Sequence, residues 1–144
     1  MTGWHIYIDG ASLGNPGQSG AGIVTYDEQG NEVWRESIHL GTMTNNMAEY
    51  EALVRALRKA CEMAITTVFV YTDSQLVANQ LLGLYRIKNE RLRKYLHEAK
   101  SLIENFHSFQ IRYIPRERNR LADKLAKNGA VSNRGGRVAA GRNP

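Results

Sequence analysis

Apolar positions change their spacing several times along the chain, and each change marks a predicted element. Residues 4–8 (WHIYI) and 66–72 (TTVFVYT) are short apolar runs rich in β-branched and aromatic residues, which favour buried strands. Residues 20–41 contain two more runs around the turn sequence DEQGN, which predicts a β-hairpin. Residues 109–115 (FQIRYIP) predict a further strand, which Pro115 stops.

Helical spacing first appears in residues 44–63. Apolar side chains recur there every three or four positions, which is typical of an amphipathic helix. They are Met47, Tyr50, Leu53, Val54, Leu57 and Cys61. Thr44, Asn45 and Asn46 are all suitable N-cap residues for this helix.

The remaining helical patterns complete the order of elements. They cover residues 74–84, 89–106 and 119–130. We expect the last helix to have Asn119 as its N-cap and Gly129 as its stop. Three strands, a helix, a strand, helices, a strand and a helix indicate an α/β fold, in which helices pack on one mixed sheet.

The length of 144 residues fits one domain, which we expect over residues 1–130. Residues 131–144 are rich in Gly and Arg, lack apolar periodicity and predict a flexible tail. This tail has three arginines and no acid, so it either contacts a polyanion or is a plain unstructured end.

Composition narrows the function classes only a little. The formal net charge of +5 is compatible with a polyanionic partner and equally with a soluble basic protein. Cys61 is the single cysteine, so no internal disulfide is expected, and no Cys/His set has zinc spacing. No apolar run has membrane-spanning length and no signal-peptide layout is seen at the N-terminus, so we expect a cytoplasmic protein.

Two carboxylates follow strand-like runs directly. Asp9 ends the first run and Asp73 ends the run at 66–72. Neighbouring parallel strands bring such ends together, where close carboxylates repel unless a proton or a divalent cation intervenes. Carboxylate oxygens suit magnesium or manganese. The alternatives are local ones, an Asx-turn for Asp9 and a helix cap for Asp73.

Glu49 and Asp123 are further candidates, because each lies in the first turn of a predicted helix. Glu49 also stands three residues after Asn46, close to capping-box spacing. Asp123 also suits the positive end of a helix dipole. Spacing alone leaves both interpretations open for each residue.

Four segments resemble, in the same order, the motifs of the type 1 ribonuclease H family. They are YIDGASLGNPGQSGAGIV, TNNMAEYEAL, VYTDSQLVANQLLG and PRERNRLADKLAKNGA, and the similarity runs from about Trp4 to Ala130. The resemblance implies a five-stranded mixed sheet flanked by helices and an endonuclease that cleaves the RNA strand of RNA–DNA hybrids. It implies two magnesium ions, with manganese as a substitute, held by Asp9, Glu49, Asp73 and Asp123. Products would carry 5′-phosphate and 3′-hydroxyl ends.

The resemblance also implies substrate contacts through short polar side chains, which suit 2′-hydroxyls and minor-groove edges. These residues are Ser12, Asn15, Asn45, Asn46 and Gln75, with Thr44 in a pocket for a DNA phosphate. For Asn15, turn formation is the alternative role and is compatible with binding.

The chain departs from many family members at two places. Many members carry a catalytic histidine before the last acid, but the segment PRERNRLAD has none. It resembles the compact branch of the family, in which an arginine takes the place of this histidine. Arg116 is our candidate for that role, and a phosphate contact or a solvated side chain is the alternative. The basic protrusion is also missing. Residues 86–100 still hold six basic residues and two acids, which predict either a strip facing phosphates or ordinary ion pairs.

Three functions stay open from the sequence. The first is an active ribonuclease H that cleaves hybrids and is expected to be a monomer. Some compact members of the family also accept double-stranded RNA, so this substrate stays open. The second is a catalytically weak module that binds hybrids or double-stranded RNA. The third is another nuclease or integrase-like activity on the same fold.

Overall fold

The computed structural model describes residues 3–132 and 137–138. These residues form six strands and four α-helices, with one 3₁₀ turn. They are β1 Gly3–Ser12, β2 Gly17–Tyr26, β3 Glu32–Met43, α1 Asn45–Glu62, β4 Thr67–Thr72, α2 Gln75–Leu81, α3 Glu90–Ile103, β5 Ser108–Tyr113, η1 Arg116–Arg118, α4 Arg120–Val131 and β6 Arg137–Val138.

One mixed sheet has the strand order β5-β4-β1-β2-β3-β6. β1 pairs antiparallel with β2 and parallel with β4, so the strands that carry Asp9 and lead to Asp73 are neighbours. The expected five strands form the sheet, and the two-residue β6 extends it beside β3. Most of the predicted flexible tail lies outside the described residues; Arg137–Val138 are described as this strand.

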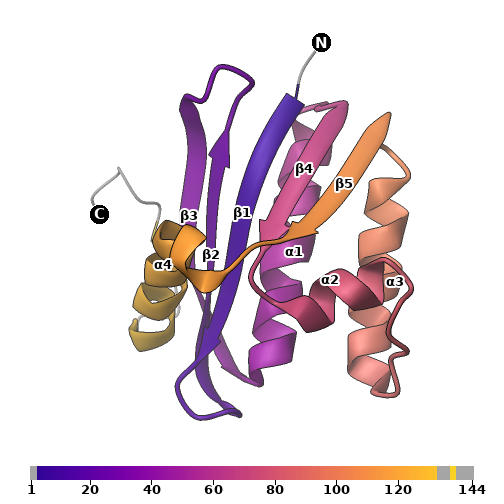
Figure 1. Ribbon diagram of the computed structural model, residues 1–144. Coiled ribbons are helices and arrows are strands. Elements are labelled where there is room, and N and C mark those ends of the chain that lie inside the picture. Colours follow the sequence, from indigo (N-terminus) through magenta and orange to yellow (C-terminus); the bar gives the residue numbers. More distant parts are fainter. Residues whose placement is uncertain (1–2, 133–136, 139–144) are drawn as a thin grey trace.

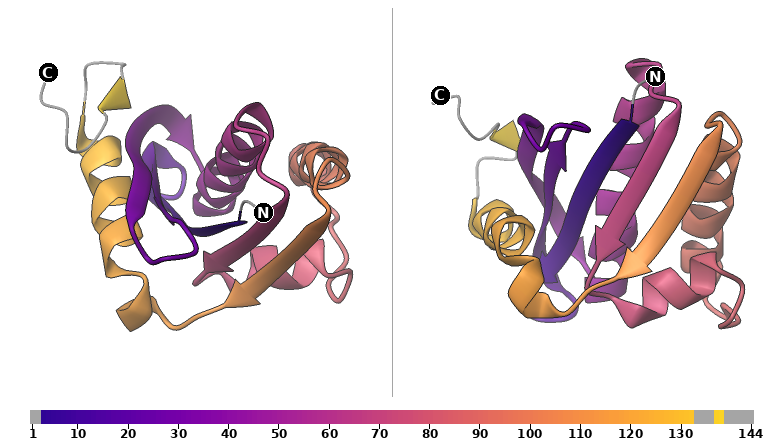
Figure 2. Two further views of the ribbon diagram at one scale, coloured as in Figure 1. Left: turned by 90° about the horizontal axis from the view of Figure 1, so that it is seen from above. Right: turned by 45° about the horizontal axis from the view of Figure 1, so that its top comes forward.

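Helices cover both faces of the sheet (Figures 1 and 2). α1 packs on one face, with α3 against it, and the main core lies between them and the sheet. Ile6, Ile8 and Ile23 of this core are fully buried. α4 packs on the other face over β2, where Val24, Ala122 and Leu125 form a smaller cluster. None of the helices in the described ranges is long and apolar enough to cross a membrane.

Side chains at the helix starts differ partly from the sequence predictions. Thr44, rather than Asn45 or Asn46, is the N-cap of α1, and its hydroxyl accepts from the Met47 amide at 3.2 Å. Asn119 is the N-cap residue of α4, but its side chain makes no cap hydrogen bond. The prediction that Gly129 stops this helix is wrong, because α4 continues to Val131.

Close packing of α4 on β2 depends on glycine in the strand. A Cβ added to Gly22 would lie 2.1 Å from the carbonyl oxygen of Ala122 and 2.6 Å from the amide nitrogen of Ala126. Backbone atoms cannot swing aside as a flexible side chain can. The whole helix, which carries Asp123, is therefore held in place through this contact.

Replacing Gly22 by Ala is expected to lower the free energy of unfolding by about 1–3 kcal/mol, because α4 must move away from the sheet. Urea denaturation measures the change. Gln18→Ala on the same strand is the control; the side chain is exposed, and we expect a change within about 0.5 kcal/mol. Equal stability of the two variants would contradict the close-packing argument.

Candidate active site

Asp9 and Asp73 lie side by side because their strands are in register. Ile8 of β1 pairs with Thr72 of β4, so the next residue of each chain segment comes to the same edge. Asp73 is not a helix cap, since Ser74 is the N-cap of α2 and its hydroxyl accepts from the Val77 amide at 3.1 Å. The local alternative for Asp73 is therefore wrong.

Glu49 reaches the same place from α1. A Cβ on Gly10 would lie 2.3 Å from the carbonyl carbon of Ala48 and 2.4 Å from the amide nitrogen of Glu49, so glycine alone allows this approach of helix and strand. The capping-box interpretation of Glu49 is wrong, because Thr44 is the N-cap and the Glu49 side chain turns into the site.

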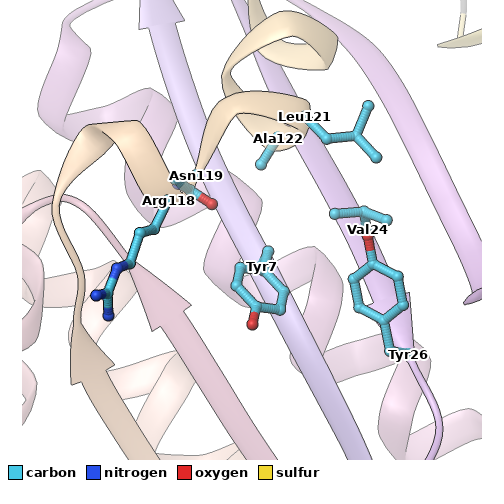
Figure 3. A pocket seen from close by; sticks show the side chains of 7 residues that line it. All are labelled: Tyr7, Val24, Tyr26, Arg118, Asn119, Leu121 and Ala122. Carbon is cyan, nitrogen blue, oxygen red and sulfur yellow. The ribbon is translucent and has the colours of Figure 1, made fainter. Parts of the chain in front are cut away.

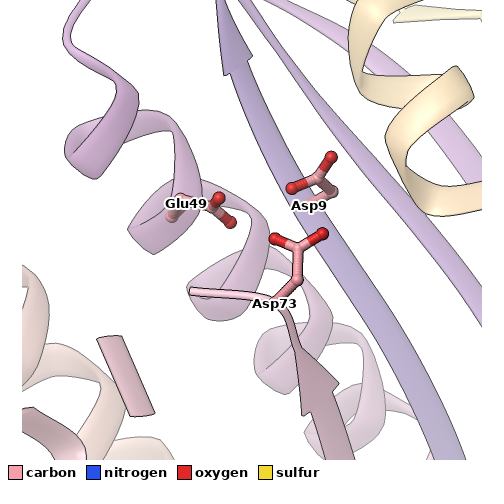
Figure 4. A group of neighbouring side chains, drawn as sticks. All are labelled: Asp9, Glu49 and Asp73. Carbon is pink, nitrogen blue, oxygen red and sulfur yellow. The ribbon is translucent and has the colours of Figure 1, made fainter. Parts of the chain in front are cut away.

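The three carboxylates converge (Figure 4). Asp9, Glu49 and Asp73 each offer an oxygen within 4.8 Å of the others. Asp9 is 3% and Glu49 9% exposed, whereas Asp73 is half-buried. Asp123 lies in the first turn of α4, and its Oδ2 atom is 3.1 Å from Lys127 Nζ. Three of the four acids that the sequence singled out thus lie together, and the charge of the fourth, Asp123, acts on Asp9.

Burial and mutual repulsion raise the proton affinity of this cluster. Burial, followed by the charges of Asp73 and Asp123, raises the pKa of Asp9 to about 8. Burial raises the pKa of Glu49 well above its usual value, and the charges of Asp9 and Asp73 add to this effect. The Gly10 amide donates to Glu49 and opposes the rise.

The cluster has the donor set of a divalent cation site. Its ligand atoms are all carboxylate oxygens, which Mg²⁺ and Mn²⁺ prefer. The Oε1 atom of Glu49 is buried and has no hydrogen-bond partner in the described part of the chain. A cation would satisfy this atom and remove the repulsion between neighbouring acids, so the residues fit a metal ion.

The expected substrate contacts form a rigid network beside the cluster. The Ser12 amide donates to Asn45 Oδ1 at 2.8 Å, and the Asn45 amide donates to Asn15 Oδ1 at 2.9 Å. The Ser12 hydroxyl in turn accepts from the Asn15 amide at 3.1 Å. The loop after β1 is thereby tied to the start of α1. Asn15 takes part in this turn and is also exposed, so turn formation does not prevent a binding role.

A groove of about 590 Å³ lies next to this network. Thr44 and Asn46 line one side and Arg91 of α3 lines the other. Gln75 opens α2, directly after Ser74. The sequence named Thr44 and Asn46 but could not show that Arg91 lies opposite them, because the two segments are more than forty residues apart.

Residues 86–100 contain an ion pair within the protein, as one of the two alternatives expected, and exposed basic residues besides. Glu98 pairs with Arg58 of α1, and Arg93 Nε donates to the Ile87 carbonyl at 2.9 Å, so part of this segment is engaged within the protein. Arg91 and Lys94 are exposed and line hollows of the surface. Arg116 is exposed in η1, three residues before Asn119.

Comparison with known proteins agrees with the motifs. Residues 7–129 match the family model described as reverse transcriptase-like. Ribonuclease HI of Halobacterium salinarum is 38% identical over 122 residues, which are 85% of this chain and 61% of the relative. The chain thus spans about three fifths of that relative's length.

Solved structures show the same architecture. The crystal structure of RNase H1 from the halophilic archaeon Halobacterium salinarum is 37% identical, with a TM-score of 0.86, over 88% of this chain and 96% of that one. LC11-RNase H1 in complex with RNA/DNA hybrid is 35% identical, with a TM-score of 0.82, over 87% of this chain and 94% of that one. By motif order, fold and these identities, the chain belongs to the type 1 ribonuclease H family.

Proposed function

We propose that this protein is a metal-dependent endoribonuclease that hydrolyses the RNA strand of RNA–DNA hybrids. The convergence of Asp9, Glu49 and Asp73 at one sheet edge is the observation that carries this proposal. The similarity to a relative solved with an RNA/DNA hybrid supports the substrate class.

The four carboxylates, Asp123 included, would hold two Mg²⁺ ions, or Mn²⁺ in their place. Bound there, the ions would stabilise negative charge at the scissile phosphate and make a bound water more acidic. The carboxylates orient the site and accept the cations, and no nucleophilic side chain is required. Hydrolysis in this manner leaves 5′-phosphate and 3′-hydroxyl ends.

Selectivity for RNA is assigned to the network beside the cluster. Ser12, Asn15 and Asn45 use part of their hydrogen-bonding capacity to hold one another. This order lowers the entropy lost on binding, and their remaining polar atoms suit 2′-hydroxyls. Asn46 and Gln75 extend the same polar surface, and Thr44 faces a phosphate of the DNA strand.

Arg116 is proposed as the residue that assists catalysis where other family members use a histidine. Its place in η1, on the segment that leads to Asp123, supports this assignment. We further propose that residues 1–130 form the catalytic domain and that the protein is cytoplasmic and monomeric.

The test is a cleavage assay with three labelled duplexes, namely an RNA–DNA hybrid, double-stranded RNA and double-stranded DNA. Each is incubated with Mg²⁺, with Mn²⁺ and with EDTA. We expect metal-dependent cutting of RNA in the hybrid and intact double-stranded DNA. Tight binding of the hybrid without cutting in either metal would instead identify a recognition module.

Arg91 provides a prediction about the groove. It is exposed and forms no ion pair within residues 3–132, so it is available to a phosphate of the DNA strand. Arg91→Ala is expected to weaken hybrid binding for all sequences. It should also make the negative slope of log K against log salt shallower by about 1. Fluorescence anisotropy at several salt concentrations measures both quantities.

Lys59→Gln is the matched control for this charge. Lys59 lies in the last turn of α1, with its ammonium over the Trp34 ring, away from the groove. We expect its salt slope to equal that of the wild type. If the slope becomes shallower by the same amount in both variants, Arg91 acts only through the net charge of the protein.

A further inference from the structure

Asn119 is placed as a helix cap but does not act as one. Thr44, Ser74 and Asn89 each accept a backbone amide hydrogen bond at the start of their own helix. Asn119 stands at the same position of α4, and its side chain makes no such bond. The residue is 2% exposed, so water does not replace the missing interaction.

Its amide group instead bonds to two segments of the candidate active site. Asn119 Nδ2 donates to the Ile8 carbonyl at 2.8 Å and contacts Asp73 Oδ2 at 3.3 Å. Both partners are acceptors, so the amide nitrogen must face them, and the opposite orientation would oppose oxygen to oxygen. Ile8 directly precedes Asp9, so this one amide contacts the backbone beside one acid and the carboxylate of another.

The main chain of Asn119 reaches the fourth acid. Its carbonyl oxygen accepts from the Asp123 amide at 3.0 Å in the first turn of α4. Figure 3 shows Asn119 at the start of this helix above β1, with Arg118 beside it pointing away. Asn119 therefore joins β1 at Ile8, the residue after β4 and the start of α4.

Packing alone does not account for an asparagine here. Asn119 Oδ1 is buried and has no hydrogen-bond partner among the described residues. A buried polar atom without a partner destabilises the folded state, and an apolar side chain would avoid that cost. The polar group at this position thus has a use other than filling space.

We propose that Asn119 is a positioning residue of the metal site. Asp73 is half-buried and follows the last residue of β4, and among the described residues Asn119 is the one that hydrogen-bonds to its carboxylate. The Asn119 amide limits rotation of this carboxylate and holds the part of β1 beside Asp9 in place next to it. This inference rests on the proposed function, because the site that Asn119 orders is the one assigned to metal and catalysis.

The test separates metal affinity from folding. In Asn119→Ser the shorter side chain can still cap α4 but cannot reach Ile8 and Asp73. We expect a moderately lower thermal midpoint, because the buried Ile8 carbonyl loses its donor, and a Kd for Mn²⁺ about 10- to 100-fold higher, measured from the free-ion signal in electron paramagnetic resonance. Hybrid cleavage should fall at low metal concentration and recover in part as Mn²⁺ is raised.

Ile65→Ala is the control for a purely structural effect, since Ile65 is buried before β4, at the end away from the cluster. Unchanged Mn²⁺ affinity in Asn119→Ser overturns the inference. The inference also fails if Ile65→Ala, at the same thermal midpoint, loses as much Mn²⁺ affinity as Asn119→Ser. If the wild type binds Mn²⁺ but does not cut hybrids, the proposed function fails, while the affinities of the two variants still decide the role of Asn119.

Discussion

Replacing Asp73 by Asn is expected to lower the rate of hybrid cleavage by about a thousandfold or more, while the protein stays folded. Loss of a carboxylate that holds the ions removes several kcal/mol of transition-state stabilisation, and about 4 kcal/mol corresponds to this factor. Single-turnover cleavage of a labelled hybrid at saturating Mg²⁺ measures the rate.

The same substitution is expected to stabilise the metal-free protein at pH 8. Among neighbouring charges, Asp73 raises the pKa of Asp9 most, and it also acts on Glu49, so its removal relieves repulsion in a buried cluster. Glu104 is an exposed acid at the end of α3, and Glu104→Gln is the control. This substitution should change neither the cleavage rate nor the stability of the metal-free protein. A folded Asp73→Asn variant that cuts at the wild-type rate would exclude the proposed site.

In EDTA, the wild-type protein is expected to lose stability as the pH rises from about 4 through about 8. The folded state raises the pKa of Asp9 from 3.8 to about 8, and that of Glu49 also rises. A carboxyl with a raised pKa stabilises the folded state fully below its unfolded pKa. This contribution disappears as the pH passes the folded value, and its size is on the order of a few kcal/mol.

Mg²⁺ should reverse this loss at pH 8 and have little effect at pH 4.5. Cations bind the deprotonated carboxylates, so protons compete with them at low pH. Urea denaturation between pH 4.5 and 8.5, with EDTA or with Mg²⁺, measures both effects. Asp73→Asn should flatten the profile in EDTA. A wild-type stability that rises steadily with pH in EDTA would contradict the predicted protonation of the cluster.

Much of the fold could be predicted because its signals are local. The apolar runs at β1 and β4, the turn sequence DEQGN and the helical spacing of α1 are each contained in a few consecutive residues. The turn is an example, since Asp27 accepts from the amides of Gln29 and Asn31, both at 2.9 Å, within the hairpin itself. Side-chain periodicity follows from backbone geometry and needs no distant partner.

The candidate site was predicted in part. The sequence placed Asp9 and Asp73 at strand ends and Glu49 and Asp123 in first turns, but left a local role open for each of them. Two placements were wrong, because β1 continues past Asp9 to Ser12 and Glu49 lies beyond the first turn of α1. Convergence depends on the parallel pairing of β1 with β4 and on the approach of α1 over Gly10. No short segment contains that information, because the contacts join residues far apart in the chain.

The sequence by itself determined the order and type of the elements and the family to which their motifs belong. Only the tertiary structure decided that Thr44 caps α1, that Arg91 faces Thr44 and Asn46 across a groove, and that Asn119 bonds to Ile8 and Asp73. Local propensity allows Asn119 to cap its helix, and long-range packing buries its amide against two acceptors instead. A buried donor must bond to the acceptors that surround it, and those acceptors are set by the fold rather than by neighbouring residues.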